Sequence, residues 1–133
     1  MARRVVLEVT ERATIDDVKD VQARVAKLRH LGFRIALDDL GAGYAGLSSF
    51  AVLEPEIVKL DMSLVRNVHL SEIRARLIGS MTNLCKQMGM LVVAEGVEAH
   101  EERDSVRAIG CDLLQGYLYA KPGPPFPVPS MLT

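Results

Sequence analysis

Five short apolar stretches recur along this chain and constrain its fold more than any other feature. They are residues 5–11 (VVLEVTE), 33–39 (FRIALDD), 56–61 (EIVKLD), 90–98 (MLVVAEGVE) and 111–117 (CDLLQGY). Near-continuous apolar runs of this length are typical of parallel strands that are buried on both faces. Acidic residues end the first four stretches and an amide lies near the end of the fifth, so polar groups recur where the predicted strands end.

The segments between these stretches have the three- or four-residue spacing of amphipathic helices. Residues 14–31 carry one apolar face, a shorter helical stretch ends at Pro55, and residues 99–109 begin with acids that suit a helix N-terminus. The longest helical pattern covers residues 71–88. Its expected buried face consists of Ile73, Leu77, Ile78, Met81, Leu84, Cys85 and Met88. Strands that alternate with helices predict a parallel sheet with right-handed crossovers.

The predicted fold class is α/β, a parallel (β/α) partial TIM-like barrel with five strands. A closed barrel of this type needs eight strands and about 200 to 250 residues, whereas this chain has 133. Five strands leave two unpaired edges and an uncovered inner face. We therefore expect the chain to form a homo-oligomer or to pair with the remainder of a longer chain. Residues 1–122 are the expected β/α domain, and residues 123–133 are a proline-rich tail.

Charge and composition exclude several classes of partner. The net charge is −1 and no long basic block occurs, so we expect neither a nucleic-acid duplex nor a membrane surface as partner. No stretch reaches the roughly 20 apolar residues that cross a bilayer, and a cytoplasmic protein is expected. Cys85 and Cys111 are predicted to be reduced packing residues, and the three histidines lack metal-ligand spacing.

The acids at the predicted strand ends indicate a cation site. In a (β/α) barrel the carboxyl ends of the strands converge on one rim, which gathers these acids around a common point. Clustered carboxylates repel one another unless protons or cations compensate their charge. Carboxylate oxygens suit Mg²⁺ or Mn²⁺, so a divalent metal is the expected compensation.

Each of these residues also has a plainer structural interpretation. Asp38 and Asp39 are compatible with a strand-end turn or a helix cap. Lys59 and Asp61 lie two apart on a strand and are compatible with a structural salt bridge. Glu98 suits the start of a helix, where the dipole favours an acid.

The same strand ends carry a pattern that resembles a known family. Five ordered segments look like successive motifs of the EAL domain, the cyclic di-GMP phosphodiesterase family: LEVTER, DDLGAGYAGLSSF, PEIVKLD, VVAEGVE and DLLQGYLYAKP. The resemblance covers residues 5–122 and matches the C-terminal half to two-thirds of the family's domain. The family's Glu-Ala-Leu strand and a later asparagine-bearing strand, which supply metal ligands, have no counterpart in the sequence.

The resemblance implies roles for five residues at the expected metal site. Glu8 corresponds to a metal-binding glutamate, and Asp38 and Asp39 correspond to the family's aspartate pair, which is associated with two metals. Lys59 resembles the lysine that positions the attacking water. Glu95 resembles the glutamate assigned as general base or as partner of a metal-bound water.

Further positions match the family's substrate and loop residues. Gln115 matches the substrate-site glutamine, although a polar residue of a barrel layer is an alternative, and Pro122 lies near the guanine-contacting end. Glu11 and Glu98 resemble the glutamates that hold the loop after the aspartate pair. Asp61 follows Lys59 in the same strand and is assigned a supporting role.

The function implied by the resemblance is hydrolysis of cyclic di-GMP to linear pGpG with Mg²⁺ or Mn²⁺. We expect this chain to be weak or inactive alone, because two ligand-bearing strands of the family are absent from it. One alternative is a non-catalytic module that binds cyclic di-GMP or dimerises. Another alternative is an unrelated phosphate-handling barrel enzyme.

Overall fold

The computed structural model describes residues 2–10, 20–43, 46–125 and 127–130. One parallel sheet has the strand order β1-β2-β3-β4-β5. Its strands are β1 (Val6–Thr10), β2 (Arg34–Leu40), β3 (Ile57–Leu60), β4 (Leu91–Ala94) and β5 (Leu113–Leu114). The helices are α1 (Val21–His30), α2 (Gly46–Leu53), α3 (Met62–Val65), α4 (Glu72–Gln87) and α5 (His100–Ile109), with 3-10 turns η1 (Ala2–Arg4) and η3 (Val68–Leu70).

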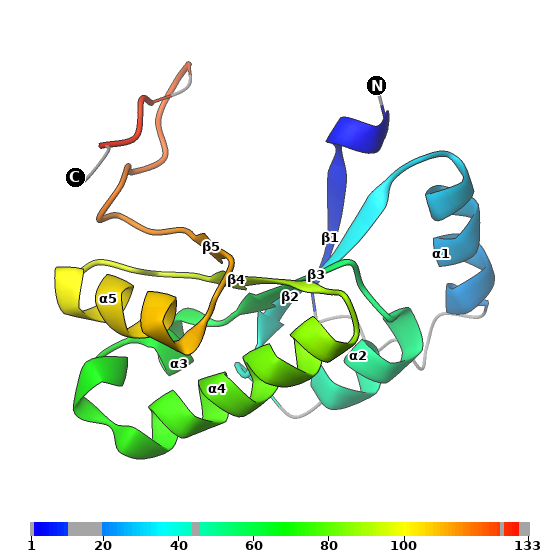
Figure 1. Ribbon diagram of the computed structural model, residues 1–133. Helices are drawn as coiled ribbons and strands as arrows, with labels where there is room; N and C mark the ends of the chain where they lie inside the picture. Colours follow the sequence, from blue (N-terminus) through cyan, green and yellow to red (C-terminus); the bar gives the residue numbers. More distant parts are fainter. Residues whose placement is uncertain (1, 11–19, 44–45, 126, 131–133) are drawn as a thin grey trace.

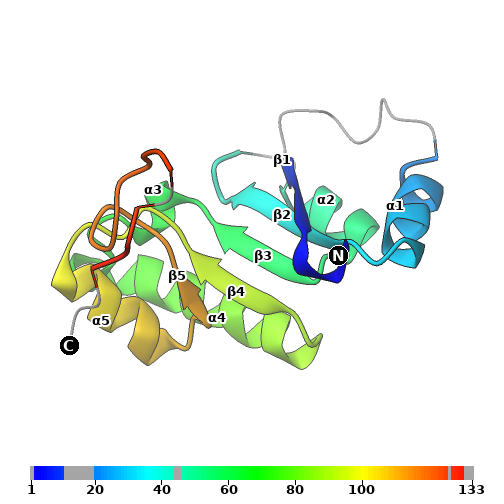
Figure 2. The same cartoon turned by 90° about the horizontal axis from the view of Figure 1, so that it is seen from above.

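The helices lie along one side of the sheet. Figure 1 shows α2, α4 and α5 beneath the strands, and the turned view in Figure 2 shows α4 running below β4. No helix within the described residues covers the opposite face of the strands. The α/β prediction with five parallel strands is therefore confirmed, and one sheet face stays open as expected of a partial barrel.

Strand β3 shows how the sheet separates a packed face from an open one. All four of its residues are buried. Val58 and Leu60 join the large apolar core under the helices. Ile57 packs on the other face in a small cluster that also contains Ala36 and Val93. Because strand side chains alternate, Lys59 shares the open inner face with Ile57.

The carboxyl end of β2 departs from regular strand geometry. Its register against β3 shifts between Leu37 and Leu40. Asp39, inside this irregularity, has φ 57°, a left-handed conformation that asparagine and aspartate tolerate better than most residues. The extra residue of a bulge redirects the side chains at a strand end, and here it sets Asp38 and Asp39 in place.

Two predicted elements differ from the structure. Asp20 has a left-handed backbone (φ 62°), so α1 begins only after it, at Val21, instead of near residue 14. Residues 11–19, which include the predicted start of this helix, lie outside the described residues. The last strand is limited to Leu113–Leu114, because the chain turns toward Val97 immediately afterwards.

The predicted buried face of α4 is only partly correct. Ile78 and Cys85 are buried, and Thr82, which the apolar pattern did not include, is buried with them. Ile73 is 82% exposed and Leu77 is 45% exposed. The apolar residues of this helix span a wide arc, and the sheet covers one side of that arc.

The remaining sequence predictions concern cysteines, histidines and membrane spans. Cys85 and Cys111 are free thiols, and burial raises the pKa of both. His30, His69 and His100 are exposed. Among the described residues, no helix combines the length and apolar content that crossing a bilayer requires.

Candidate metal and substrate site

Four ionisable side chains from four segments meet at the carboxyl end of the sheet. The Lys59 ammonium nitrogen, Nζ, lies 2.9 Å from Oε1 of Glu8 on β1 and 3.4 Å from Oδ1 of Asp38 on β2. It lies 2.8 Å from Oε1 of Glu95, which directly follows β4. The predicted convergence of the strand-end acids is thus present, and Lys59 is its centre.

Backbone hydrogen bonds hold these strand ends in register. The Asp61 N–H donates to the Leu40 carbonyl, and the Glu95 N–H donates to the Leu60 carbonyl. The Gln115 N–H in turn donates to the Ala94 carbonyl at 2.9 Å. The backbone hydrogen bonding of the sheet therefore continues one residue past β3, β4 and β5. It holds Asp61, Glu95 and Gln115 at the carboxyl edge of the sheet.

The electrostatics of Lys59 follow from burial and three acids. Its side chain is only 8% exposed. Burial alone would lower the pKa of Lys59, but hydrogen bonds to Glu95 and Glu8 and the charge of Asp38 raise it above its usual value. Lys59 therefore stays charged across the physiological range and compensates part of the negative charge.

Glu95 behaves differently from an ordinary surface acid. Burial raises the pKa of Glu95, and the neighbouring Asp38 carboxylate raises it further, while Lys59 opposes both effects. The net result is a raised pKa. A carboxylate whose pKa moves toward neutrality is a better proton acceptor than an unperturbed one.

Three carboxylates form a group with the geometry of a cation site. One oxygen each from Asp38, Asp39 and Glu95 can be chosen so that all three lie within 4.8 Å of one another. Asp38 also accepts the Asp39 N–H at 3.0 Å through Oδ1, which fixes its orientation. Oxygen-only donors at this spacing fit a hard divalent cation such as Mg²⁺ or Mn²⁺. Glu8 contacts Lys59 at the edge of this group.

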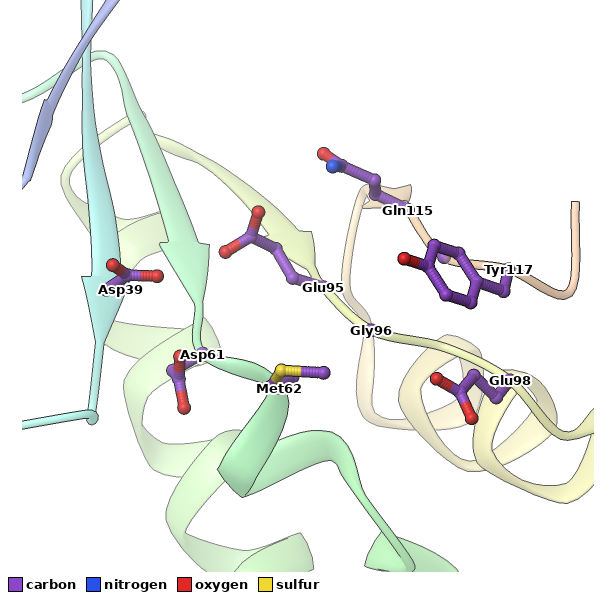
Figure 3. Close-up of a pocket in the computed structure, with 9 residues that line it drawn as sticks. Asp39, Asp61, Met62, Glu95, Gly96, Glu98, Gln115 and Tyr117 are labelled. Atoms are coloured by element: carbon purple, nitrogen blue, oxygen red, sulfur yellow. The ribbon is translucent and has the colours of Figure 1, made fainter. Parts of the chain in front are cut away.

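A cavity of about 260 Å³ adjoins the carboxylates. Figure 3 shows Asp39 and Glu95 on one side of it and Gln115 and Tyr117 on the other. Its lining residues are Asp39, Asp61, Met62, Glu95, Gly96, Glu98, Gln115, Gly116 and Tyr117. Acids, an amide and an aromatic ring thus surround one space, which suits a polar ligand with a planar part.

A second hollow, of about 380 Å³, lies on the open inner face of the sheet. Its lining residues are Val6, Glu8, Ala36, Ile57, Lys59, Val93, Leu113, Leu114 and Gln115. Most of these residues are apolar, and Lys59, which also lines the hollow, contacts Asp38 and Glu95 of the carboxylate group. Gln115 lines both spaces, so it stands where the polar and apolar regions meet.

The other predicted site residues have separate positions. Asp61 caps α3 by accepting the Ser63 N–H at 2.9 Å, and it also lines the first cavity. Glu98 pairs with Arg66 at 2.9 Å. Pro122 lies exposed in the C-terminal segment, outside both linings. Glu11 lies outside the described residues.

Two features of this region were not identified from the sequence. Glu102 is 1% exposed, and its carboxylate accepts the N–H groups of Asn67, Glu98 and Ala99. Its position three residues after Ala99 at the start of α5 was the available signal, since an acid there often binds helix N-terminal amides.

The second feature is a close approach at Gly96. A Cβ atom on Gly96 would stand 2.4 Å from Cβ of Met62, and Gly96 has φ 69°. Only glycine meets both conditions without strain. This contact brings the loop after β4 against the start of α3 and shapes the cavity floor.

Comparisons with known proteins identify the family. The sequence pattern that defines the EAL domain matches residues 1–122. This chain belongs to the EAL domain family. The match spans every strand of the sheet. The residues of the carboxylate group therefore lie within the part of the chain that matches the family.

Curated relatives are longer proteins. The cyclic di-GMP phosphodiesterase PdeF of Escherichia coli is 37% identical over 123 residues, which are 92% of this chain and 16% of PdeF. The chain therefore spans a small part of the length of this relative. The similarity concerns one segment of a larger polypeptide.

Solved structures share the fold of this EAL domain chain. A standalone EAL protein from Vibrio cholerae in its c-di-GMP bound form has a TM-score of 0.89 and 36% identity, over 98% of this chain and 55% of its own. Klebsiella pneumoniae BlrP1 in calcium and manganese complexes with cyclic di-GMP has TM-scores of 0.84 and 0.82 at 37% and 38% identity. Each BlrP1 match covers 91% of this chain and 31% of the other.

Proposed function

We propose that this EAL domain chain carries the metal-binding and proton-accepting part of a phosphodiesterase that converts cyclic di-GMP to linear pGpG. The observation that carries the proposal is the convergence of Glu8, Asp38 and Glu95 on Lys59, beside a cavity that Gln115 lines. Relatives named as cyclic di-GMP phosphodiesterases and neighbours in complex with the nucleotide support it. The proposed domain is residues 1–122, and residues 123–133 are its tail.

The proposed metal ligands are Glu8, Asp38 and Asp39, and the catalytic Glu95 adds its carboxylate to the same acidic group. The cation would be Mg²⁺ or Mn²⁺, and the calcium and manganese complexes of BlrP1 support a divalent ion. When bound, such a cation stabilises the negative charge that develops on a phosphate during hydrolysis.

The chain's own residues supply positioning and proton transfer in this proposal. Lys59 donates hydrogen bonds and orients a water against the phosphorus atom. As the water oxygen forms its bond to phosphorus, the bond to the 3′ oxygen breaks, and the leaving oxygen takes up a proton from solvent. Glu95 accepts the proton of the attacking water, for which its raised pKa suits it. Gln115 and Pro122 are proposed substrate contacts, and Tyr117 offers a ring beside the cavity.

Asp61, Glu98 and Glu11 are proposed to support the loops around this site. Asp61 does so by capping α3, and Glu98 by its pair with Arg66. We expect the chain to be cytoplasmic and weakly active alone. The first cavity is smaller than the roughly 300 to 1,000 Å³ typical of enclosed ligand sites, so a dinucleotide would be only partly surrounded.

Metal binding is the first test of the proposed site. Titration calorimetry with Mn²⁺ is expected to show saturable binding to the purified chain. Asp38→Asn and Glu95→Gln should each weaken the affinity at least about tenfold, because each removes a charged oxygen donor. Glu101→Gln, at an exposed acid of α5, is the matched control and should bind Mn²⁺ like the parent. Equal affinities in all four proteins would contradict the assignment.

Turnover is the second test. With Mn²⁺ and cyclic di-GMP, we expect linear pGpG to form at less than about 0.1 s⁻¹, well under the roughly 10 s⁻¹ of a median enzyme. Losing part of a catalytic constellation commonly costs orders of magnitude in rate. Fast turnover by the isolated chain would contradict the expectation of weak activity.

A second candidate function is a non-catalytic module that binds cyclic di-GMP or associates with a protein chain. The open inner face and the strand edges that stay unpaired within the described residues favour it. Such a module would pair with further copies of itself in a homo-oligomer, or with the remainder of a longer chain. Calorimetry separates the candidates, because nucleotide binding without pGpG formation supports a receptor. The EAL family match leaves no support for an unrelated phosphate-handling barrel enzyme.

A further inference from the structure

The amino ends of β1 and β2 bring together two segments that are distant in the sequence. The turn η1 precedes β1, and the end of α1 precedes β2. A Cβ atom on Gly32 would lie 3.5 Å from Cγ of Arg3, and the Arg34 N–H donates to the Val5 carbonyl. Figures 1 and 2 both show η1 beside the end of α1 and the start of β2. Side chains of the two segments therefore share one surface of the molecule.

This surface is strongly basic. Residues 2–5 and 27–34 carry five lysine or arginine side chains and no acid. Within the described residues, Arg29 alone of these five forms an ion pair, with Glu56, and an exposed acid, Glu54, adjoins it. The four that form no such pair are all exposed: Arg3, Arg4, Lys27 and Arg34. The net charge of −1 for the whole chain thus conceals a local excess of positive charge.

Two exposed apolar side chains lie among these cations. Leu31, at the C-cap of α1, is 57% exposed, and Val5, which directly follows Arg4, is 40% exposed. Cations combined with exposed apolar groups are typical of surfaces that lie at a membrane interface, where headgroups bind the cations and the acyl boundary takes the apolar side chains. A nucleic-acid backbone would use the cations alone. The pair of apolar residues therefore favours a lipid surface.

We propose that this surface, here called the amino-edge patch, binds an anionic membrane. The patch consists of Arg3, Arg4, Val5, Lys27, Leu31 and Arg34. It lies at the amino ends of the strands, whereas the carboxylate group lies at their carboxyl ends, so a membrane-bound chain keeps the candidate metal site away from the bilayer. The proposal is independent of the phosphodiesterase chemistry. It departs from the expectation of no membrane partner, which considered only the total charge.

The expected binding is electrostatic and sensitive to salt. Each lysine or arginine close to an anionic leaflet contributes about fivefold in affinity, so four cations favour an anionic over a neutral bilayer by on the order of a few hundredfold. Screening shortens the range of this attraction from about 10 Å at 0.1 M salt to about 3 Å at 1 M. Binding should therefore be clear at low salt and lost at about 1 M.

Sedimentation with sucrose-loaded vesicles tests the charge. At low salt the chain is expected to pellet with vesicles of phosphatidylserine and phosphatidylcholine, and to stay in solution with phosphatidylcholine alone. Arg4→Glu should weaken the partition at least about tenfold, because it replaces an attraction by a repulsion. Arg107→Glu, at an exposed arginine of α5, makes the same change of net charge elsewhere and should partition like the parent. Circular dichroism shows that each variant is folded.

A fluorescent probe tests the apolar pair. The chain has no tryptophan, so Leu31→Trp introduces a single one. With anionic vesicles its emission should shift to the blue, and lipids brominated on their acyl chains should quench it, because the side chain enters the acyl boundary. Leu70→Trp, at a 76% exposed position of η3, is the control and should show neither effect.

Three results would overturn the proposal. The first is the same partition, or none, on neutral and anionic vesicles at low salt. The second is an equal loss of partition in Arg4→Glu and Arg107→Glu, which would mean that the cations act from no particular surface. The third is unchanged emission of Leu31→Trp on vesicles together with tight binding of the chain to a DNA duplex, which would assign the patch to a nucleic acid. Metal and cyclic di-GMP are absent from all these measurements, so their failure leaves the proposed function standing.

Discussion

At the scale of single residues, Lys59 controls the electrostatics of the strand ends. Its ammonium contacts acids from three different segments, and it is almost completely buried. A buried charge that loses its partners is costly, and the same holds for the acids that Lys59 neutralises. Because the folded-state pKa of Lys59 is raised, its contribution to stability is present below the unfolded value of about 10.4 and is lost only as pH rises through the folded value.

Lys59→Met should therefore destabilise the chain at neutral pH. We expect the free energy of unfolding to fall by about 3 to 5 kcal/mol at pH 7, as for other broken buried pairs. The loss should be smaller at pH 5, because Glu95, whose pKa is already raised, takes up a proton and relieves the repulsion. Urea unfolding at the two pH values measures both quantities. Lys86→Met, at an exposed lysine of α4, is the control and should change stability by less than about 0.5 kcal/mol.

At the scale of elements, two contacts join segments that are distant in the sequence. Glu102 at the start of α5 binds the backbone N–H of Asn67, between α3 and η3. Gly116, just after β5, packs directly on Val97 in the loop after β4. Both contacts hold the loops that line the first cavity, so each has its own test.

Glu102→Gln tests the first contact through pH. Burial would raise the pKa of Glu102, but its backbone donors and Arg66 lower it overall. Its stabilisation is therefore present above the unfolded value of about 4.3 and is lost as pH falls through the lower folded value. Urea unfolding should show a loss of about 2 to 4 kcal/mol for Glu102→Gln at pH 7, shrinking toward pH 3. The neighbouring Glu101→Gln should show little loss at any pH, and a constant deficit in Glu102→Gln would contradict the argument.

Gly116→Ala tests the second contact. An added Cβ would stand 2.0 Å from the Val97 carbonyl oxygen and 2.4 Å from its nitrogen, so the backbone has to move. We expect a loss of at least about 2 kcal/mol, as for other overpacked sites. Gly79→Ala on α4 is the matched control, because its Cβ would meet only Ile109 at 3.8 Å and alanine favours helix by up to about 1 kcal/mol. In thermal unfolding, the midpoint temperature of Gly116→Ala should lie below that of the parent, and the midpoint of Gly79→Ala should lie above it.

At the scale of the whole molecule, the sheet has a protected centre and two outer strands. Strands β2, β3 and β4 each pair on both sides, whereas β1 and β5 each pair on one side within the described residues. The helices cover one face only, as Figure 2 shows. Local stability should therefore fall from β3 outward in both directions.

Hydrogen exchange measures this gradient. The amides of β3, whose residues are all buried, should exchange at the rate set by global unfolding. The outward-facing amides of β1 and β5 should exchange faster, because no strand within the described part of the chain accepts from them. Equal protection of β1 and β3 would mean that the β1 edge is covered in solution.

The sequence predicted most of the fold for a clear physical reason. Apolar runs alternating with helical spacing leave few arrangements other than a parallel α/β sheet, and the structure has that sheet. The gathering of Glu8, Asp38 and Glu95 follows from the same topology, since parallel strands end at one edge.

The details that the sequence did not predict depend on tertiary contacts. The wide apolar arc of α4 does not reveal which side meets the sheet, so exposed Leu84 and buried Thr82 were assigned wrongly or missed. The left-handed conformation of Asp39 follows from pairing between β2 and β3, which no local pattern shows. The sequence predicts only that residues 99–109 begin with acids, and the burial of Glu102 depends on its amide partners at Asn67 and in the turn before α5.

The position of Lys59 has a consequence for how the fold depends on a bound cation. One ammonium group ties the ends of β1, β2 and β4 together by itself, so these strand ends are held in place whether or not the proposed metal site is filled. On the proposed function, removal of the metal would therefore abolish turnover without unfolding the chain.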